Sequence, residues 1–242
     1  MSLNQSVSVS PDESVDEILR GKLRIIQSKK GYRFSIDAIL LAEFALRHAK
    51  GLLVDLGTGC GIVALSLLAM GANAHIIGIE IQKELAHQAM RNSILNRLQE
   101  RFSVIHGDIR YIPLKRGCID MVLSNPPFRR PRSCLMSPDM SKAVAKNQIL
   151  MSLDDLIEGA RYLLKSKGRL CLVYPAEQAT VLIQGLRRKG LEPKRVSFQH
   201  PTPDSRAELL LLEAQMGARP GLIIEPPIFG QGSHSNICQV QA

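Results

Sequence analysis

The sequence predicts an α/β protein with a mainly parallel seven-stranded sheet, an antiparallel last strand and helices on both faces. From residue 51 onward, apolar runs of strand length alternate with longer runs of helical spacing. Such alternation implies right-handed crossovers between parallel strands, with helices covering both faces. The last two apolar runs have no helix between them, so they predict a hairpin whose second strand is antiparallel.

The chain before residue 51 is expected to form a small extension. Residues 1 to about 15 are rich in Ser, Asp and Glu, which predicts a disordered lead-in. Residues 23–27 are apolar enough for a short strand, and a turn follows. Ser35 is a favoured N-cap residue, and apolar positions at helical spacing predict a helix over 36–48.

Residues 51–214 are predicted to form one domain. Its strands are expected over 52–55, 75–80, 102–106, 119–123, 169–174, 192–199 and 208–214. Its helices are expected after Gly61 to about residue 70 and then over 82–98, 153–164 and 177–189. The tail over 215–242 is rich in Gly, Pro and Ser and is predicted to be irregular.

The composition fits a globular protein and excludes a wholly disordered one. The 242 residues are 45% hydrophobic and 22% charged, enough to bury a sizeable core. No apolar run approaches the ~20 residues that span a bilayer. The N-terminus is polar and acidic, where a secretory signal peptide would be basic and then apolar. We therefore expect a soluble, cytoplasmic protein with no membrane partner.

The net charge points to a polyanionic partner without proving one. There are 31 Lys and Arg against 22 Asp and Glu, giving +9, and a basic surface favours nucleic acid. Solvated helix ends and loops explain the same charges equally well. The candidate RNA-binding residues lie in two basic clusters: Lys29, Lys30 and Arg33, and Arg129, Arg130 and Arg132.

A glycine-rich loop follows the first predicted strand of the sheet. Asp55 ends this strand, and Gly57, Gly59 and Gly61 follow at alternate positions around Thr58. Glycine permits positive φ and lets a ligand approach the backbone closely. Because ligands bind at the carboxyl ends of the strands in open α/β sheets, this loop is a candidate ligand site.

The second predicted strand ends in an acid, Glu80, which lies 23 positions after Gly57. An acidic side chain there can accept both hydroxyl protons of a ribose. A dinucleotide dehydrogenase would share this logic, but its fingerprint is G-x-G-x-x-G. Here the spacing is G-x-G-x-G, with an acid before it, which resembles motif I of the S-adenosylmethionine-dependent methyltransferases.

This resemblance implies a Rossmann-like methyltransferase fold and S-adenosylmethionine as cofactor. In the family, the glycine loop packs against the methionine part of the cofactor, and the acid of the second strand holds the ribose. Asp108 follows the third strand, where the family often has an Asp that accepts from the adenine amino group. The resemblance therefore implies that Asp55, the loop, Glu80 and Asp108 bind the cofactor.

Asn125-Pro126-Pro127-Phe128 follows the fourth strand and is the most specific motif in the chain. It resembles the N-P-P-[FY] motif of methyltransferases that modify nitrogens conjugated to planar systems, such as adenine N6, guanine N2 and glutamine amides. We predict these four residues to be catalytic, and Asn125 also to be cofactor-binding.

The chemistry of an exocyclic amine explains these residue types. Its lone pair is delocalised into the ring, which makes it a poor nucleophile. The Asn125 side-chain oxygen and the Pro126 carbonyl can each accept one amino hydrogen, and the two prolines stiffen the turn. Phe128 offers a face on which a base can stack. The reaction would be a direct in-line transfer by positioning and charge stabilisation.

Residues 26–42 resemble the N-terminal signature of the bacterial tRNA adenine-N6 methyltransferases, and the likeness extends from about residue 25 to residue 214. That family modifies the adenosine beside the anticodon of a valine tRNA. The resemblance implies an RNA substrate, most of all tRNA, and places Asp37 and Tyr32 near the cofactor pocket. A structural role of Asp37 and simple packing of Tyr32 are equally compatible with the sequence.

Several alternatives stay open. The rRNA guanine-N2 and protein-glutamine methyltransferases share the motif. The rRNA enzymes often carry an additional domain, and the glutamine enzymes typically have a longer N-terminal domain and Tyr after the prolines. A non-catalytic RNA-binding module that retains the cofactor pocket is the alternative of another class. The G-x-G-x-G spacing disfavours a nicotinamide dehydrogenase. The His and Cys residues show no metal-ligand spacing, so no metal is expected. The sequence leaves the oligomeric state open.

Overall fold

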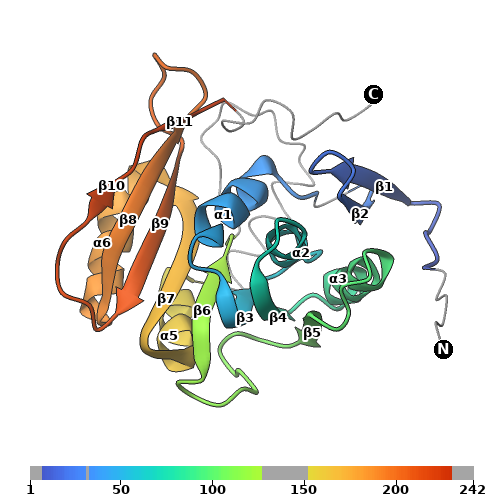
Figure 1. Ribbon diagram of the computed structural model, residues 1–242, viewed down its shortest axis with the longest axis horizontal. Coiled ribbons are helices and arrows are strands. Elements are labelled where there is room, and N and C mark those ends of the chain that lie inside the picture. The colour runs from blue at the N-terminus through green and yellow to red at the C-terminus, as the bar shows by residue number, and fades with distance from the viewer. Residues whose placement is uncertain (1–6, 31–32, 127–151, 231–242) are drawn as a thin grey trace.

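A mixed sheet forms the middle layer of the protein (Figure 1). The computed structural model describes residues 7–30, 33–126 and 152–230, and in these ranges the sheet has nine strands. Seven of them follow the order β8-β9-β7-β6-β3-β4-β5. Their bounds are β3 Lys50–Leu56, β4 Asn73–Glu80, β5 Phe102–His106, β6 Ile119–Ser124, β7 Leu164–Pro175, β8 Leu191–His200 and β9 Leu209–Met216.

The direction of the strands confirms the predicted fold class. Neighbouring strands from β7 to β5 pair in parallel, whereas β9 is antiparallel to both β7 and β8. The strand β7 begins five residues earlier than the predicted range of 169–174, and its pairing with β6 is irregular between Ile119 and Met121. Lys167 there has a φ of 62°.

Helices cover both faces of the sheet, as predicted (Figure 1). Two buried apolar clusters lie on opposite faces, one beneath α1 to α3 and the other beneath α5 and α6. α1 and α3 end two or three residues before the predicted ends; α3 is closed by Arg97, which has a φ of 58°. The bounds are α1 Ile36–Leu46, α2 Ile62–Ala69, α3 Lys83–Leu95, α5 Leu153–Leu163 and α6 Ala179–Arg188, with a short 3₁₀ turn, η1 Ala176–Gln178.

The N-terminal segment contains a strand that the sequence did not predict. β1 (Glu13–Ile18) pairs antiparallel with β2 (Leu23–Ser28), so residues 13–15, expected in the lead-in, begin a hairpin. Glu13 forms a two-pronged ion pair with Arg91 of α3, with N–O distances of 2.7 and 2.8 Å. This pairing lowers the pKa of Glu13 to about 2. The charges that suggested a disordered segment therefore attach it to the domain.

Two asparagines, Asn92 in α3 and Asn96 at its C-cap, bind the free edge of β2. The side-chain amide of Asn92 accepts from the N–H of Ile26 at 2.7 Å and donates to its carbonyl at 3.0 Å. One helical turn later, Asn96 makes the same pair of bonds with Arg24, at 2.9 and 2.7 Å. Residues i and i+4 of a helix share a face, and residues i and i+2 of a strand share an edge, so the two spacings match.

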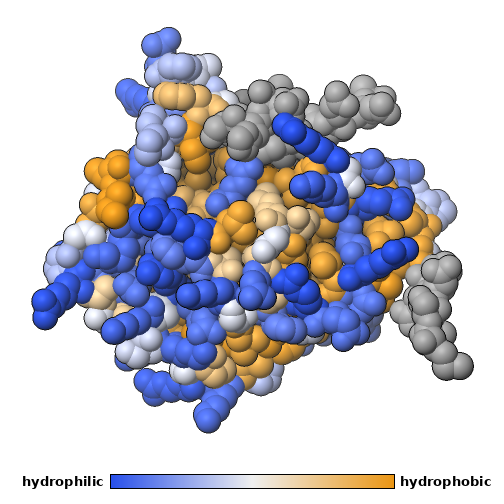
Figure 2. Space-filling model, in the orientation of Figure 1, coloured by the Kyte–Doolittle hydropathy of each residue, from blue (hydrophilic) through white to orange (hydrophobic). Residues whose placement is uncertain are grey.

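The tail adds two short strands where the sequence predicted irregular structure. β10 (Ile223–Ile224) and β11 (Ile228–Phe229) pair in parallel with β8. The side chains of Ile223 and Ile224 are exposed and form an apolar patch over β10 (Figure 2). In the described part of the chain, no helix is both long and apolar enough to cross a membrane.

Candidate functional site

The candidate site lies at the carboxyl ends of four adjacent parallel strands, β6, β3, β4 and β5. The strands end close together: the Ser124 hydroxyl at the end of β6 donates to the carbonyl of Leu56 at the end of β3, at 2.8 Å. Beside them, the N–H of Gly107 donates to the carbonyl of Glu80 at 2.9 Å. The fold therefore brings the glycine loop, Glu80, Asp108 and Asn125 to one edge of the sheet, as the sequence predicted.

The glycine loop turns tightly over the neighbouring strand. The backbone N–H groups of Gly57 and Thr58 both donate to the carbonyl of Ile79 in β4, at 2.9 and 3.1 Å. Gly57 and Gly59 have φ values of 73° and 59°, in the left-handed region that side chains other than glycine rarely adopt. The loop thus keeps its backbone close against the sheet.

Two further glycines, Gly61 after the loop and Gly78 in β4, leave room for side chains that pack against the loop. Gly61 is the N-cap of α2 with a φ of 88°, and a Cβ there would lie 2.8 Å from the Phe102 ring. On β4, a Cβ on Gly78 would lie 2.6 Å from Cγ2 of Thr58. Gly61 was predicted from the sequence, whereas Gly78 was missed because it lies inside a strand, outside the loop motif.

Asp55 is a buried acid with an unsatisfied oxygen. Its side chain is 1% exposed, and Oδ2 accepts from the Thr58 hydroxyl at 2.6 Å. Oδ1 is buried and has no hydrogen-bond partner in the described structure. Burial raises the pKa of this carboxyl from 3.8 to about 7, against the opposing effect of the Thr58 hydrogen bond.

Glu80 is the second buried acid and is 5% exposed. One carboxylate oxygen accepts from the N–H of Gly59 at 2.9 Å and the other from the N–H of Gln82 at 2.8 Å. Burial raises its pKa, although these backbone bonds favour the ionised form. A carboxylate has about four acceptor positions, so each oxygen keeps capacity for a ligand.

The two buried carboxylates at the carboxyl ends of β3 and β4 suit a cationic ligand that carries hydroxyl groups. In the described ranges, no ion pair involves Asp55 or Glu80. Buried acids without a counter-charge are costly, and a ligand that brings positive charge and hydroxyl donors would offset that cost. S-adenosylmethionine has both, in its sulfonium, its ammonium and its ribose, so the residues present fit this cofactor.

Asp108 lies at the predicted edge, but it already has a partner. Nε of Arg110 donates to both carboxylate oxygens at 3.0 Å, and Nη2 lies 2.5 Å from Oδ2. Arg110 lowers the pKa of Asp108, so the carboxylate stays ionised. An adenine amino group at this position would have to share the carboxylate with Arg110.

The site residues predicted before residue 51 differ in their surroundings. Asp37 is buried in the first turn of α1, where its carboxylate accepts from the Ser35 hydroxyl at 2.8 Å. Arg33 pairs with Asp16 of β1 at 2.6 Å, and Lys29 donates to a backbone carbonyl at 2.9 Å, so both stabilise the hairpin. Lys30 is exposed.

Only part of the predicted catalytic motif lies in the described structure. Asn125 is half-buried and Pro126 is buried directly after β6. The remaining predicted residues of this region lie outside the described residues: Pro127, Phe128, Arg129, Arg130 and Arg132, together with Tyr32 in the N-terminal segment.

Asn92 supports the glycine loop from below and was missed by the sequence analysis. Besides its bonds to β2, its amide donates to the carbonyl of Cys60 at 2.9 Å, and its side chain is fully buried. A buried amide in the middle of an amphipathic helix needs hydrogen-bond partners. That helix position was the available signal, but it does not reveal which segments provide the partners.

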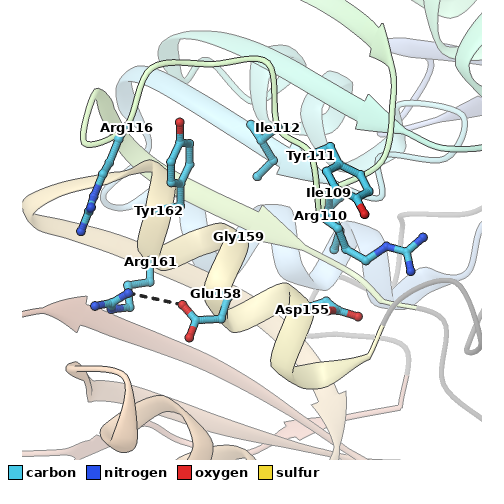
Figure 3. A pocket seen from close by; sticks show the side chains of 10 residues that line it. All are labelled: Ile109, Arg110, Tyr111, Ile112, Arg116, Asp155, Glu158, Gly159, Arg161 and Tyr162. Carbon is cyan, nitrogen blue, oxygen red and sulfur yellow. Dashed lines mark hydrogen bonds and ion pairs between the residues drawn. The ribbon is translucent and has the colours of Figure 1, made fainter.

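Two cavities lie outside this edge. One, of about 490 Å³, lies between the loop 109–116 and α5 (Figure 3). Another, of about 730 Å³, lies at the amino ends of the strands, beside Lys50 and Lys167. The described residues contain no group of three or more His, Cys, Asp or Glu placed to hold a metal ion.

Comparisons with known proteins agree with this geometry. The model of the methyltransferase small domain family matches residues 35–186, from the start of α1 to near the end of α6. The match therefore includes the glycine loop, Glu80, Asp108 and the whole Asn-Pro-Pro-Phe motif. The predicted methyltransferase family and fold are confirmed.

Curated relatives are similar over most of the chain. A tRNA1(Val) (adenine(37)-N6)-methyltransferase of Parabacteroides distasonis is 31% identical over 193 residues, covering 79% of this chain and 80% of the relative. One of Porphyromonas gingivalis is 32% identical over 197 residues, covering 78% and 76%. Among solved structures, a predicted O-methyltransferase of Agrobacterium tumefaciens superposes with a TM-score of 0.65 at 22% identity, covering 83% of this chain and 90% of that one.

Proposed function

We propose that this chain methylates adenine N6 in a tRNA. The premise is that it belongs to the methyltransferase small domain family and to the family of bacterial tRNA1(Val) (adenine(37)-N6)-methyltransferases. The observation that carries the proposal is the position of the Asn-Pro-Pro-Phe motif. It begins directly after β6, beside β3, the strand that carries the buried Asp55. The reaction uses S-adenosylmethionine.

The cofactor would be held by the acids and backbone of the sheet edge. Glu80 would accept from the ribose hydroxyls with the capacity that its two backbone bonds leave free. Asp55 would lie near the methionine part, whose positive charge would favour the ionised carboxylate, and its unsatisfied Oδ1 could accept a hydrogen bond there. When bound, the cofactor supplies an electrophilic methyl group on its sulfonium.

Asn125 and Pro126 would orient the acceptor amine. The Asn125 side-chain oxygen and the Pro126 carbonyl each accept one amino hydrogen, which turns the nitrogen lone pair toward the methyl group. The amine nitrogen would bond to the methyl carbon as the carbon–sulfur bond breaks, which would leave the neutral thioether S-adenosylhomocysteine. The positively charged nitrogen would then release one proton to solvent. The same two oxygens stabilise the developing positive charge. Phe128 would stack on the adenine.

The substrate adenine must leave its stack, or already be unpaired, for its amine to reach this edge. The proposed RNA-binding residues Lys29, Lys30 and Arg33 lie on the N-terminal hairpin and its connection to α1. In the second cluster, Arg129, Arg130 and Arg132 follow the catalytic motif directly. Phosphate contacts from these cations would make binding strongly salt-dependent. A tRNA substrate implies that the protein acts in the cytoplasm.

The product of the reaction tests the proposal. The purified protein is incubated with methyl-labelled cofactor and with tRNA, rRNA and protein from a strain that lacks the gene. The labelled fraction is then digested and its modified residue identified by mass. We expect N6-methyladenosine in the tRNA fraction. Label in rRNA guanine or in protein glutamine would keep the fold and overturn the substrate.

A substitution of Asn125 tests the assigned chemistry. Asn125→Ala should reduce transfer by at least about 100-fold, because a positioned hydrogen-bond acceptor is lost from the transition state. The cofactor Kd should change by less than about threefold, because the side-chain amide, although near the cofactor, serves mainly the acceptor amine. Asn73→Ala, an exposed asparagine at the opposite end of β4, is the matched control and should change neither quantity. An equal loss of cofactor affinity and transfer would contradict the role given to Asn125.

A further inference from the structure

An exposed aromatic side chain lies next to the candidate site. Tyr111 is 79% exposed, although aromatic rings usually bury most of their surface. Its backbone N–H donates to the carbonyl of Asp108 at 2.9 Å, so the turn that places Asp108 also fixes Tyr111. The ring is therefore presented to solvent from an ordered loop that starts at the candidate site.

The loop that carries Tyr111 forms one wall of a cavity of about 490 Å³, and α5 forms the other (Figure 3). The two walls approach closely at Gly159, where a Cβ would lie 3.3 Å from Cδ1 of Ile112. Further along, the Tyr162 hydroxyl donates to the carbonyl of Leu114 at 3.2 Å. These contacts make the cavity a fixed feature of the fold.

Arginines lie along the cavity from one end of α5 to the other. Figure 3 shows Arg110 and Tyr111 near Asp155, at the start of α5, and Arg116 near Tyr162, at its end. The seven residue steps from Asp155 to Tyr162 span about 10 Å of helix axis at 1.5 Å per step. That length matches about three stacked nucleotides, which rise 3.4 Å each.

The two acids that line the cavity, Asp155 and Glu158, have hydrogen-bond or ion-pair partners of their own. Glu158 forms ion pairs with Lys189 and, at 3.4 Å, with Arg161, and these cations lower its pKa. The carboxylate of Asp155 caps its helix and accepts from the Ser152 hydroxyl at 2.7 Å. Arg116 has no ion pair among the described residues. Of the arginines that line the cavity, Arg116 is therefore the one whose charge no described acid pairs with.

We propose that this cavity binds the RNA strand that flanks the target adenosine, a contact that rests on the function proposed above. Tyr111 stacks on an unpaired base, and Arg116 binds a backbone phosphate further along the cavity. An aromatic platform beside a basic groove is the usual chemistry of single-stranded RNA binding. The position next to Asp108 lets the strand continue from the cavity to the candidate catalytic edge.

Substitutions of Tyr111 test the stacking contact. Fluorescence anisotropy with a labelled tRNA anticodon stem-loop measures RNA affinity without requiring catalysis. Tyr111→Ala should weaken RNA binding and raise the KM for RNA by about fivefold or more, the loss expected for one stacked base. Tyr111→Phe keeps the ring and should stay within about twofold of the wild type. The Kd for S-adenosylhomocysteine and the value of kcat should not change in either variant.

Salt dependence tests the phosphate contact. Arg116→Ala should reduce the slope of log K against log salt by about 0.7, the value for one phosphate on a single strand. Arg188→Ala, on the exposed end of α6 and outside the cavity, is the matched control and should leave the slope unchanged.

The outcomes separate this contact from the proposed function. RNA affinity that is unchanged in Tyr111→Ala, or an equal fall in affinity for S-adenosylhomocysteine, would overturn the contact. Weaker RNA binding by Tyr111→Ala, with no N6-methyladenosine formed by the wild type, would support the contact and overturn the proposed reaction. A wild type that does not bind the stem-loop would overturn both.

Discussion

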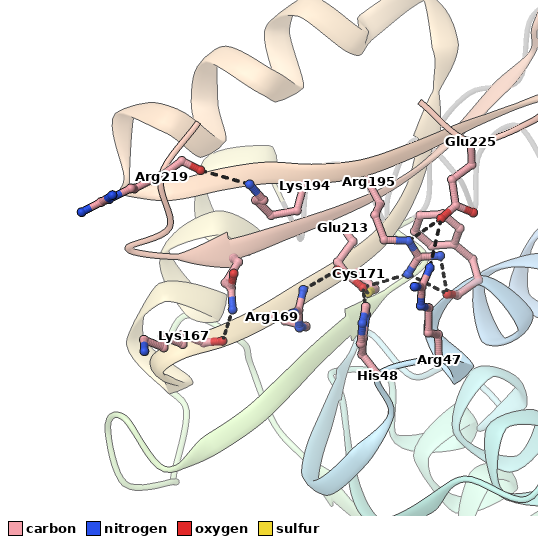
Figure 4. Close-up of polar contacts among 12 residues, drawn as sticks. Arg47, His48, Lys167, Arg169, Cys171, Lys194, Arg195, Glu213, Arg219 and Glu225 are labelled. Carbon is pink, nitrogen blue, oxygen red and sulfur yellow. Dashed lines mark hydrogen bonds and ion pairs between the residues drawn. The ribbon is translucent and has the colours of Figure 1, made fainter. Parts of the chain in front are cut away.

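Asp55 and Glu80, at the carboxyl ends of β3 and β4, are almost as buried as Glu213 in β9. Their hydrogen-bond and ion-pair partners, however, differ from those of Glu213. Glu213 is fully buried and pairs with Arg195 at 3.0 Å, with His48 at 2.8 Å and with Arg169 at 2.5 Å (Figure 4). Among the described residues, Asp55 and Glu80 have only neutral donors, and one oxygen of Asp55 has none.

The difference separates an acid that stabilises the fold from acids that await a ligand. Arg195 links the Glu213 cluster to the tail, because its Nε donates to Glu225 at 2.6 Å, and to α1, because its guanidinium lies 4.3 Å above the Phe44 ring. A buried charge with its counter-charges in place is internally satisfied. For Asp55 and Glu80, in contrast, the described residues supply no counter-charge, and a bound cation would provide one.

The largest expected effect is the loss of the paired acid. Glu213→Gln should lower the free energy of unfolding by about 3–5 kcal/mol, because it leaves buried cations without their counter-charge. Urea denaturation measures this loss. Glu192→Gln is the matched control, since Glu192 pairs with the more exposed Arg187 and should cost at most about 1 kcal/mol. Equal costs for the two variants would contradict the claim that the buried ion pairs of Glu213 stabilise the fold more than an exposed pair does.

The next effect concerns the unpaired acids. Glu80→Gln should raise the Kd for S-adenosylhomocysteine by about 10- to 100-fold, because hydrogen bonds to a charged group contribute about 1.5–3 kcal/mol. Its free energy of unfolding should fall by less than that of Glu213→Gln, since no buried cation loses a partner. Calorimetry measures the Kd, with the exposed Glu84→Gln as control. An unchanged Kd would remove Glu80 from the cofactor site.

The titration of Asp55 gives the third effect. Its pKa is 3.8 unfolded and about 7 in the folded protein, so the folded state binds the proton more tightly. Its stability contribution is complete below about pH 4 and is lost as the pH rises to about 7. Without ligand, Asp55→Asn should therefore gain stability over the wild type from pH 5 to pH 7, by at most about 1.4 kcal/mol per pH unit.

Thermal or urea unfolding of the two proteins at pH 5, 6, 7 and 8 measures this difference, which should level off above pH 7. A difference independent of pH would mean that Asp55 is already ionised throughout the range. Cofactor affinity of the wild type should rise over the same window, because the ionised carboxylate is the form that a cation prefers.

The smallest effect is that of the hydroxyl beside Asp55. Thr58→Val keeps the side-chain shape against Gly78 and removes the 2.6 Å hydrogen bond. Because that bond lowers the pKa of Asp55, its loss should raise the pKa further and weaken cofactor binding at pH 8 by about fivefold, equivalent to about 1 kcal/mol. Thr58→Ser, which keeps the hydroxyl, is the control and should bind within about twofold of the wild type.

The sequence predicted the features that depend on pattern. The order of strands and helices, the antiparallel β9 and the edge that gathers Asp55, Glu80, Asp108 and Asn125 follow from hydrophobic periodicity and from the rule that parallel strands end together. Each of these depends on neighbours in the sequence or on topology, which a single sequence contains.

Features that depend on distant partners were not predictable. Glu13 lies in β1 because Arg91 binds it, although its own segment is acidic and polar. Asn92 anchors both β2 and the glycine loop, and Glu213 is buried among cations from several elements. In each case the residue type is visible in the sequence, but its partner is more than 15 residues away.

Hydrogen exchange with and without S-adenosylhomocysteine tests the central claim most directly, because it locates the ligand along the chain. We expect slower exchange in peptides that cover residues 55–61 and 80–82, and no change in those that cover β8 and β9, where Glu213 is already paired. Slower exchange at the amino ends of the strands, around residues 48–52 and 165–169, with none in the glycine loop, would contradict the assignment of the cofactor to Asp55 and Glu80.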